Sequence, residues 1–257
     1  MAVEYEKVGH IAYVTINRPE AMNTLDPKSV EELKQIWIDV KKDDEVRVAV
    51  LTGKGPRAFC CGRDIKKTPP SRDPVLVEFF RDEVSPISEM LECDKPIIAA
   101  INGYAVGGGL ELALACDLRI ASKNAKFGLP EVSRGSLAGL NGTQCLPRYI
   151  PHAIAMKMLL TGELIDASEA YRIGLVSDVV DQEDLMPLAT KYAERIAKNA
   201  PLSVRAAKLA AYLGKDMPLH HAIVFGHFVW GLLRDTHDRT EGFRAFLEKR
   251  EAHFQGR

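Results

Sequence analysis

Two runs of aliphatic residues limit the possible folds of this chain more than any other feature. Val46 to Leu51 and Pro96 to Ile101 are almost continuously apolar, and Thr52-Gly53 closes the first of them. A strand with one face in water alternates apolar and polar residues, so uninterrupted runs are typical of strands covered on both faces. We therefore expect an α/β fold, with strands interleaved with helices.

The flanking segments predict further elements. His10 to Asn17 alternates like a half-buried strand. Asp26 can cap a helix and Pro27 suits its first turn, so a helix is predicted to about Lys42. Its apolar stripe is Val30, Leu33, Trp37 and Val40. We also expect a loop at 68–74, a helix at 75–91, short strands at 118–121, 125–127 and 175–180, and a mainly helical chain from residue 151.

The composition excludes several classes of protein. The chain has 257 residues and a formal net charge of −1, so it has no long-range field to attract nucleic acid or an anionic membrane. No apolar run has the length of a membrane span, and the N-terminal segment does not resemble a signal peptide. We expect a cytoplasmic protein that binds neither nucleic acid nor membrane. The 5 cysteines lack CxxC spacing, which favours reduced thiols over disulfides or a zinc site, and no metal is expected.

The segment around Gly107-Gly108-Gly109 carries the first chemical signal. It joins a buried strand to the apolar helix LELALACD, so its glycines can bring the backbone close to a ligand and expose N–H groups at the helix start. Neither a P-loop nor a dinucleotide motif fits the spacing. Glu111 lies in the first turn of this helix, where it either serves a site or complements the helix dipole. Glu131 follows a proline and on its own is an ordinary turn acid.

Taken together, three segments resemble the crotonase superfamily, in order and along essentially the whole chain. They are Ala58-Phe-Cys-Cys-Gly-Arg-Asp-Ile65, Gly103-Tyr-Ala-Val-Gly-Gly-Gly-Leu-Glu-Leu112, and Phe127 to Gly139, supported by NRPEAMNTL near the start and EGFRAFLEKR near the end. The resemblance implies a spiral of ββα repeats at 1–195 and a helical C-terminal region at 196–257. In this family such helices assemble homotrimers, often paired as hexamers.

The resemblance also implies an enoyl-CoA hydratase. The backbone N–H groups of Arg63 and Gly108 would form an oxyanion hole for the thioester carbonyl. Glu111 would deprotonate the attacking water and Glu131 would protonate C2, giving reversible syn addition to a trans-2-enoyl-CoA, while Gly139 positions the water. Coenzyme A is part of the substrate, and no separate cofactor is expected.

Further residues are implied in binding coenzyme A. They are Ala58, Cys60, Cys61, Asp64, Ile65, Lys66, Phe246 and Lys249. Lys249 either reaches a CoA phosphate, across a subunit boundary if need be, or is an exposed helix charge, and Lys66 has the same two interpretations. No base accompanies Cys60 and Cys61, which argues against a nucleophilic thiol.

Two departures from the family pattern flank the acyl pocket. Relatives commonly have a small or apolar residue where Arg63 stands, and this side chain can pair with an aspartate or with the substrate. Where many relatives read Gly-Gly-Thr-Gln after the counterpart of Gly139, this chain reads Leu140-Asn141-Gly142-Thr143-Gln144. Because both changes lie beside the acyl pocket, the sequence does not identify the acyl group of the substrate.

Two other functions remain as alternatives. One is isomerisation or a specialised dehydration on the same fold, with one glutamate carrying the proton. The other is an RNA-associated binding module, against which the near-neutral charge argues because RNA binding needs a basic surface.

Overall fold

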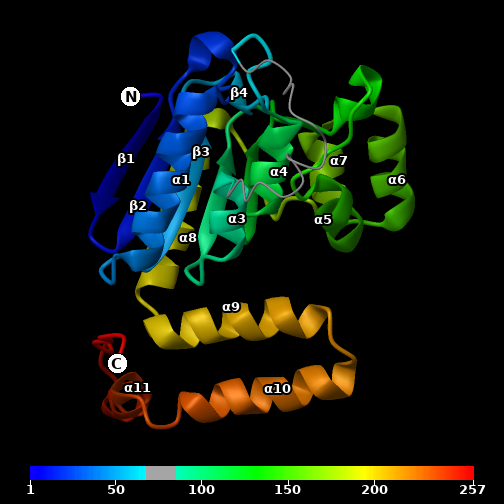
Figure 1. Cartoon of the computed structure of the whole chain (residues 1–257). Helices are drawn as coiled ribbons and strands as arrows, with labels where there is room; N and C mark the ends of the chain where they lie inside the picture. The colour runs from blue at the N-terminus through cyan, green and yellow to red at the C-terminus, as the bar shows by residue number, and fades with distance from the viewer. Residues whose placement is uncertain (68–84) are drawn as a thin grey trace.

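The structure is a computed structural model that describes residues 1–67 and 85–257 (Figure 1). The predicted loop at 68–74 and most of the predicted helix at 75–91 lie outside these residues. In the described part, α3 (Pro86–Leu91) begins at its own cap, because Ser85 is extended and its side chain accepts a hydrogen bond from the Ser88 N–H at 3.1 Å. The prediction of one helix running through residue 85 to residue 91 is therefore wrong at this point.

The main sheet has six strands in the order β1-β2-β3-β5-β7-β10. The first pair is antiparallel and every following pair is parallel. The strands are β1 (Val3–Val8), β2 (Ile11–Ile16), β3 (Val48–Gly53), β5 (Ile97–Ile101), β7 (Leu118–Ser122) and β10 (Asp178–Val180).

Both faces of this sheet are covered, which explains the continuous aliphatic runs. On β3, Ala49 and Leu51 face the core that contains α1 (Pro27–Lys42), while Val48 and Val50 face α8 (Leu185–Ala197). The expectation of a strand buried on both sides is confirmed. The α1 helix also begins as predicted, because the Asp26 side chain accepts a hydrogen bond from the Ser29 N–H at 2.9 Å.

A second, smaller sheet lies beside the first and completes the repeats. Its order is β4-β6-β8-β9, from β4 (Ala58–Cys60), β6 (Tyr104–Val106), β8 (Lys126–Gly128) and β9 (Ile165–Asp166). The pairs β3–β4, β5–β6 and β7–β8 each contribute one strand to each sheet, and α4 (Gly108–Leu114) follows β6. This arrangement confirms the expected crotonase-like spiral of ββα units.

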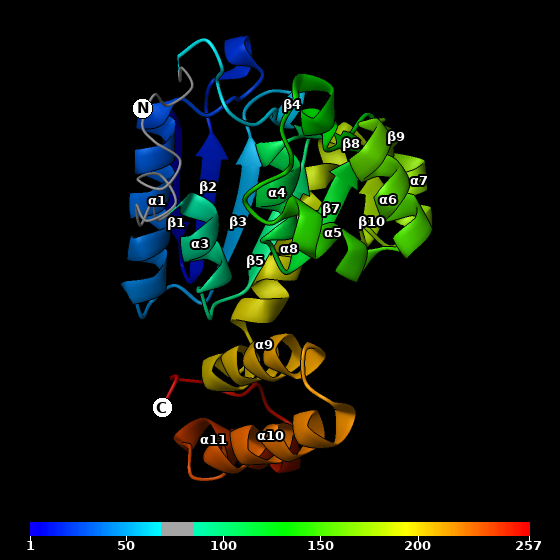
Figure 2. The ribbon, with the colours of Figure 1, turned by 45° about the vertical axis from the view of Figure 1, so that its right-hand side comes forward.

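Three short helices lie on the side of the smaller sheet (Figure 2). They are α5 (Gly142–Tyr149), α6 (His152–Thr161) and α7 (Ala167–Arg172). The described residues also form the 3-10 helices η1 (Pro19–Ala21), η2 (Pro130–Arg134) and η3 (Gln182–Asp184). Asp166 caps α7 by accepting a hydrogen bond from the Glu169 N–H at 2.9 Å, while the Glu169 carboxylate pairs with Arg172. None of the helices in 1–67 and 85–257 combines the length and apolarity needed to cross a membrane.

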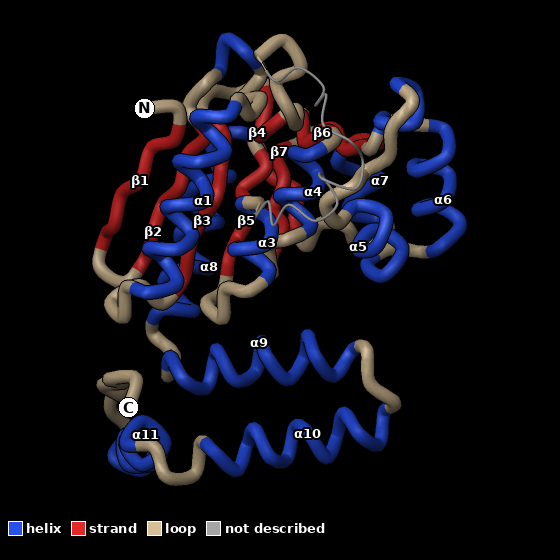
Figure 3. Tube along the Cα trace, in the orientation of Figure 1, coloured by secondary structure: helices blue, strands red, loops and turns tan. Residues whose placement is uncertain are grey.

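The C-terminal helices form a separate layer beyond one end of the main sheet (Figure 3). They are α9 (Pro201–Lys215), α10 (Leu219–Leu232) and α11 (His237–Glu248). The α10 sequence is apolar on nearly every side, yet Val229 is its one buried residue. Leu219, Phe228 and Leu232 are each more than 70% exposed. The boundary at residues 195/196 stays a prediction, and α8 continues to Ala197.

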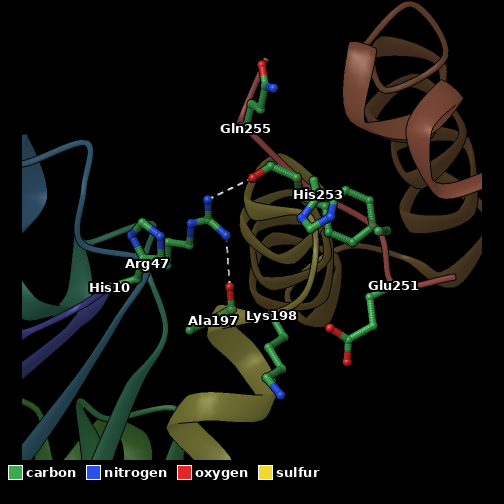
Figure 4. A pocket seen from close by; sticks show the side chains of 9 residues that line it. His10, Arg47, Ala197, Lys198, Glu251, His253 and Gln255 are labelled. Carbon is green, nitrogen blue, oxygen red and sulfur yellow. Dashed lines mark hydrogen bonds between the residues drawn. The ribbon is translucent and has the colours of Figure 1, made fainter. Parts of the chain in front are cut away.

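The C-terminal tail is fastened to both layers. Arg47 donates to the carbonyl oxygens of Ala197 and Phe254, each at 2.9 Å (Figure 4). Asp238, only 1% exposed, accepts the backbone N–H groups of Gln255 and Gly256 at 2.7 and 2.8 Å. A hollow of about 420 Å³ lies beside these contacts. Neither Glu111 nor Glu131 lines it, so it is separate from the predicted catalytic residues.

Candidate active site

Glycines allow two segments of the chain to meet at the start of α4. Gly62 and Gly107 have φ values of +79° and +59°, a region that side chains disfavour. A Cβ on Gly62 would lie 2.9 Å from the Gly108 nitrogen, and one on Gly109 would lie 1.8 Å from the Cys60 carbonyl oxygen. Only glycine permits this approach, which explains the triplet.

Two backbone N–H groups are available at this meeting point. Arg63 forms a parallel bridge with Leu25: the Leu25 N–H donates to Gly62 O, and the Asp64 N–H donates to Leu25 O, each at 2.8 Å. In such a bridge the N–H of Arg63 itself points away from Leu25. Neither it nor the N–H of Gly108, in the first turn of α4, has an acceptor among the residues described. A Cβ on Gly108 would lie 3.9 Å from the Arg63 nitrogen, so the two donors are neighbours.

Glu111 is buried in the first turn of α4 and is held by the backbone. Its Oε1 accepts from the N–H groups of Leu140, Asn141 and Gly142 at 2.8, 2.9 and 2.9 Å. These donors lie where α5 begins, so the helix dipole also favours negative charge there. The Asn141 side chain donates to the main-chain oxygen of Glu111 at 3.1 Å. These contacts fix the position and orientation of the carboxylate.

Glu131 lies in η2, where its surroundings disfavour the ionised form. Burial, and to a smaller degree the charge of Glu111, raises the pKa of Glu131, while Arg134 acts in the other direction. Its Oε2 is buried without a partner within 1–67 and 85–257. A Cβ on Gly107 would lie 3.2 Å from its Oε1, which places the carboxyl group against the glycine turn. A group that resists ionisation here can donate a proton.

The loop after η2 supplies a further N–H group. Gly139 is exposed, and its N–H has no acceptor in the described part of the chain. The next residue, Leu140, donates to Glu111. The structure therefore places Gly139 beside the carboxylate, where a water-positioning role stays a prediction.

The residues predicted to bind coenzyme A divide into three groups. Ala58 and Cys60 are fully buried, and burial raises the pKa of the Cys60 thiol to about 12, so it is no nucleophile. Cys61 and Asp64 are partly exposed, and Ile65 and Lys66 are exposed near the oxyanion donors. The contacts with coenzyme A stay predictions.

The third group lies far from the glutamates. Phe246, which is 81% exposed, belongs to α11, and Lys249 caps that helix. Figures 1 and 2 place α11 in the C-terminal layer, across the molecule from α4. One chain does not bring these two residues to its own site.

Pairing between distant residues was not visible in the sequence. Arg18, with a side chain only 8% exposed, binds Asp64 at 2.8 Å and lies 3.4 Å from Asp26. It also donates to Thr24 O at 2.5 Å. These contacts fix the segment that presents the Arg63 N–H. In the sequence, Arg18 drew attention only as part of the segment NRPEAMNTL, and Asn141 only as a departure from the family pattern.

Comparisons with known proteins of similar sequence and structure point to one family. A sequence model described as enoyl-CoA hydratase/isomerase matches residues 6–257. The chain is 62% identical over 256 residues to (E)-benzylidenesuccinyl-CoA hydratase of Thauera aromatica, covering 100% of both. It is 42% identical to crotonyl-CoA hydratase of Syntrophomonas wolfei, covering 97% and 96%. The crystal structure of an enoyl-CoA hydratase from Bacillus anthracis superposes with a TM-score of 0.92 at 35% identity, covering 100% of both chains.

Proposed function

The chain belongs to the enoyl-CoA hydratase/isomerase family, and we infer that it is an enoyl-CoA hydratase acting on acyl-CoA thioesters. The observation that carries this function is the pair of carboxyl groups beside the two free backbone donors. Three backbone N–H groups hold the Glu111 carboxylate in place, whereas burial raises the pKa of Glu131. A base and an acid beside two free backbone donors are the groups that hydration of an activated double bond requires.

The proposed reaction follows from these positions. The thioester oxygen accepts hydrogen bonds from the N–H groups of Arg63 and Gly108. Glu111 removes a proton from water as its oxygen bonds to C3, and the electron pair of the double bond moves toward the thioester oxygen. Glu131 then gives its proton to C2 on the same face. Transfer of the proton from Glu111 back to Glu131 restores the site. Each N–H donor stabilises the developing oxyanion by about 3 to 4 kcal/mol in comparable sites.

The proposed substrate is a substituted 2-enoyl-CoA rather than a plain chain. The relative at 62% identity is named for (E)-benzylidenesuccinyl-CoA, and we propose the same class of aryl-substituted thioester for this chain. Exposed apolar side chains near the glutamates support the proposal, because an aryl group needs apolar contacts. They are Ile65, Val132, Leu137 and Leu140, with exposures between 41% and 66%.

The enzyme is proposed to work as a homotrimer, or as a dimer of trimers. An exposed apolar helix such as α10 is typical of a surface covered by another chain. In such an assembly Phe246 and Lys249 would approach the site of a neighbouring copy, which is how their predicted contacts with coenzyme A could form. No cofactor is needed, since coenzyme A is part of the substrate, and a cytoplasmic location stays a prediction.

Mass-resolved turnover tests the function. Short, branched and aryl enoyl-CoA thioesters are incubated with wild type, Glu111→Gln and Glu131→Gln, with Glu169→Gln as a control at a surface carboxylate bound to Arg172. We expect the wild type and the control to add one water, and both active-site variants to lose about 100-fold or more of this rate. Double-bond shifts without water would support an isomerase instead. No turnover of any thioester would contradict the proposed function.

A further inference from the structure

Arg63 has an unusual electrostatic position. Its side chain is exposed and has no acid partner among the residues that the structure describes. Two aspartates adjoining Arg63 in the fold already have partners: Arg18 binds Asp64, and Asp26 is bound by Lys67 at 3.1 Å and lies 3.4 Å from Arg18. The hydrogen bond from Arg18 lowers the pKa of Asp64.

The backbone of the same residue is part of the proposed oxyanion hole. The Arg63 N–H is one of two donors for the thioester oxygen, and Cα is one bond from that nitrogen. The guanidinium group is therefore tethered beside the thioester carbonyl. An acyl group without charge offers this arginine no ion pair, and contact with it would remove water from the guanidinium without compensation.

We propose that the Arg63 guanidinium binds a carboxylate carried by the acyl group, so that the substrate class is the monothioester of an unsaturated dicarboxylic acid. Guanidinium and carboxylate match in charge and in planar shape, and the pair forms two parallel hydrogen bonds. A succinyl monothioester has a free carboxylate only a few bonds from the thioester carbonyl, within reach of the same residue. The inference rests on the proposed function in one respect, the position of the thioester oxygen at the two N–H donors.

Arg134 is a competing cation on the other side of the site, beside Glu131, whereas Lys66 is predicted to contact coenzyme A. Arg134 lies three residues after Glu131, its side chain is exposed, and it too has no acid partner within 1–67 and 85–257. Its charge acts on Glu131, where it opposes the rise in pKa. Arg134 thus has an electrostatic role toward the proton donor that Arg63 lacks. For this reason Arg63 is assigned as the residue that determines specificity.

The test compares two thioesters that differ in one group: (E)-benzylidenesuccinyl-CoA and the analogue whose free carboxylate is a carboxamide. Values of kcat/KM are measured for wild type, Arg63→Met, Arg63→Lys and Arg134→Met. Arg172→Met, at an exposed arginine on α7, is the matched control. The quantity compared is the ratio of kcat/KM for the acid to that for the amide, because a general disturbance of the oxyanion hole lowers both values together.

We expect Arg63→Met to lower this ratio about 10- to 100-fold, mainly through KM for the acid. Arg63→Lys should retain part of the preference, since it keeps the charge but loses the planar fork. Arg134→Met and Arg172→Met should leave the ratio within about threefold of wild type. An unchanged ratio in Arg63→Met, or a fall confined to Arg134→Met, would overturn the assignment.

Binding of the saturated analogues separates this inference from the proposed function. Calorimetry with benzylsuccinyl-CoA and its amide needs no turnover. Preference for the acid that disappears in Arg63→Met, without hydration of any enoyl-CoA, would retain the carboxylate site and reject the hydratase. Equal hydration of the acid and the amide by wild type would retain the hydratase and reject the carboxylate site.

Discussion

Substitutions of Glu111 should affect stability and activity to different degrees. Its Oε1 is the acceptor for three backbone N–H groups, of which those of Asn141 and Gly142 are buried and that of Leu140 is in an exposed residue. Glu111→Ala removes this acceptor. An unpaired buried donor costs about 1–3 kcal/mol, so the two buried groups together should lower the free energy of unfolding by about 2–6 kcal/mol. Glu111→Gln keeps an acceptor oxygen and should cost about 1 kcal/mol, through the loss of charge.

Activity should respond differently. Both variants lack the base, so both should lose about 10²- to 10⁴-fold in the rate of hydration. Urea unfolding at one fixed protein concentration measures the first quantity, and spectrophotometric hydration of an enoyl-CoA measures the second. Glu169→Ala is the control at a surface carboxylate, where we expect little change in the free energy of unfolding because water screens the ion pair with Arg172. If Glu111→Ala were as stable as wild type, the backbone donors would not be holding the carboxylate. A Glu111→Gln enzyme within tenfold of wild type would rule out its role as base.

Three further predictions concern Glu131, Gly109 and Asp238. Because folding raises the pKa of Glu131, this group stabilises the folded state fully below its ordinary pKa of 4.5, and the stabilisation is lost as pH rises through the raised pKa. The free energy of unfolding, measured between pH 4 and 8, should show this loss in wild type and not in Glu131→Gln. Parallel pH curves for the two proteins would contradict the prediction. Gly109→Ala places a Cβ 1.8 Å from a backbone oxygen and should abolish folding into a soluble form, as judged by size-exclusion chromatography, whereas retained folding would reject the close approach. Asp238→Ala should free the C-terminal tail and speed its proteolysis at least several-fold while the sheet stays protected, and equal rates would show that other contacts hold it.

Elements with local signals were predictable from the sequence. The helix α1 has a capping aspartate, a proline in its first turn and an apolar stripe, and β3 has an uninterrupted aliphatic run. By contrast, β1 was not predicted. Only Val3 of this strand is buried, because an edge strand can be held by backbone pairing to β2 while most of its side chains face water. Its sequence, VEYEKV, therefore carries little hydrophobic signal.

The candidate site was predictable only where a residue type is itself informative. The glycine turn and Glu111 stood out because a buried carboxylate beside a glycine triplet is unusual, and Glu131 gained meaning from the resemblance. The contact between Arg18 and Asp64 joins residues 46 positions apart, and no spacing rule predicts such a pair. The two hydrogen bonds from Asn141 to Glu111 also join residues far apart in the sequence, so they too could not be predicted. The sequence could not show whether Phe246 and Lys249 approach the active site, because that contact would need a second chain.

The means by which Glu111 is held has a consequence for how this site can diverge. Every residue except proline has a main-chain N–H group, whatever its side chain. A substitution at Leu140 therefore changes the surface beside the substrate but keeps the N–H that donates to Glu111. Selection can therefore alter the wall of the acyl pocket one residue at a time without first rebuilding the base. A fold that anchors its base in this way is well suited to acquire new acyl specificities by drift and selection in the loop that leads into α5.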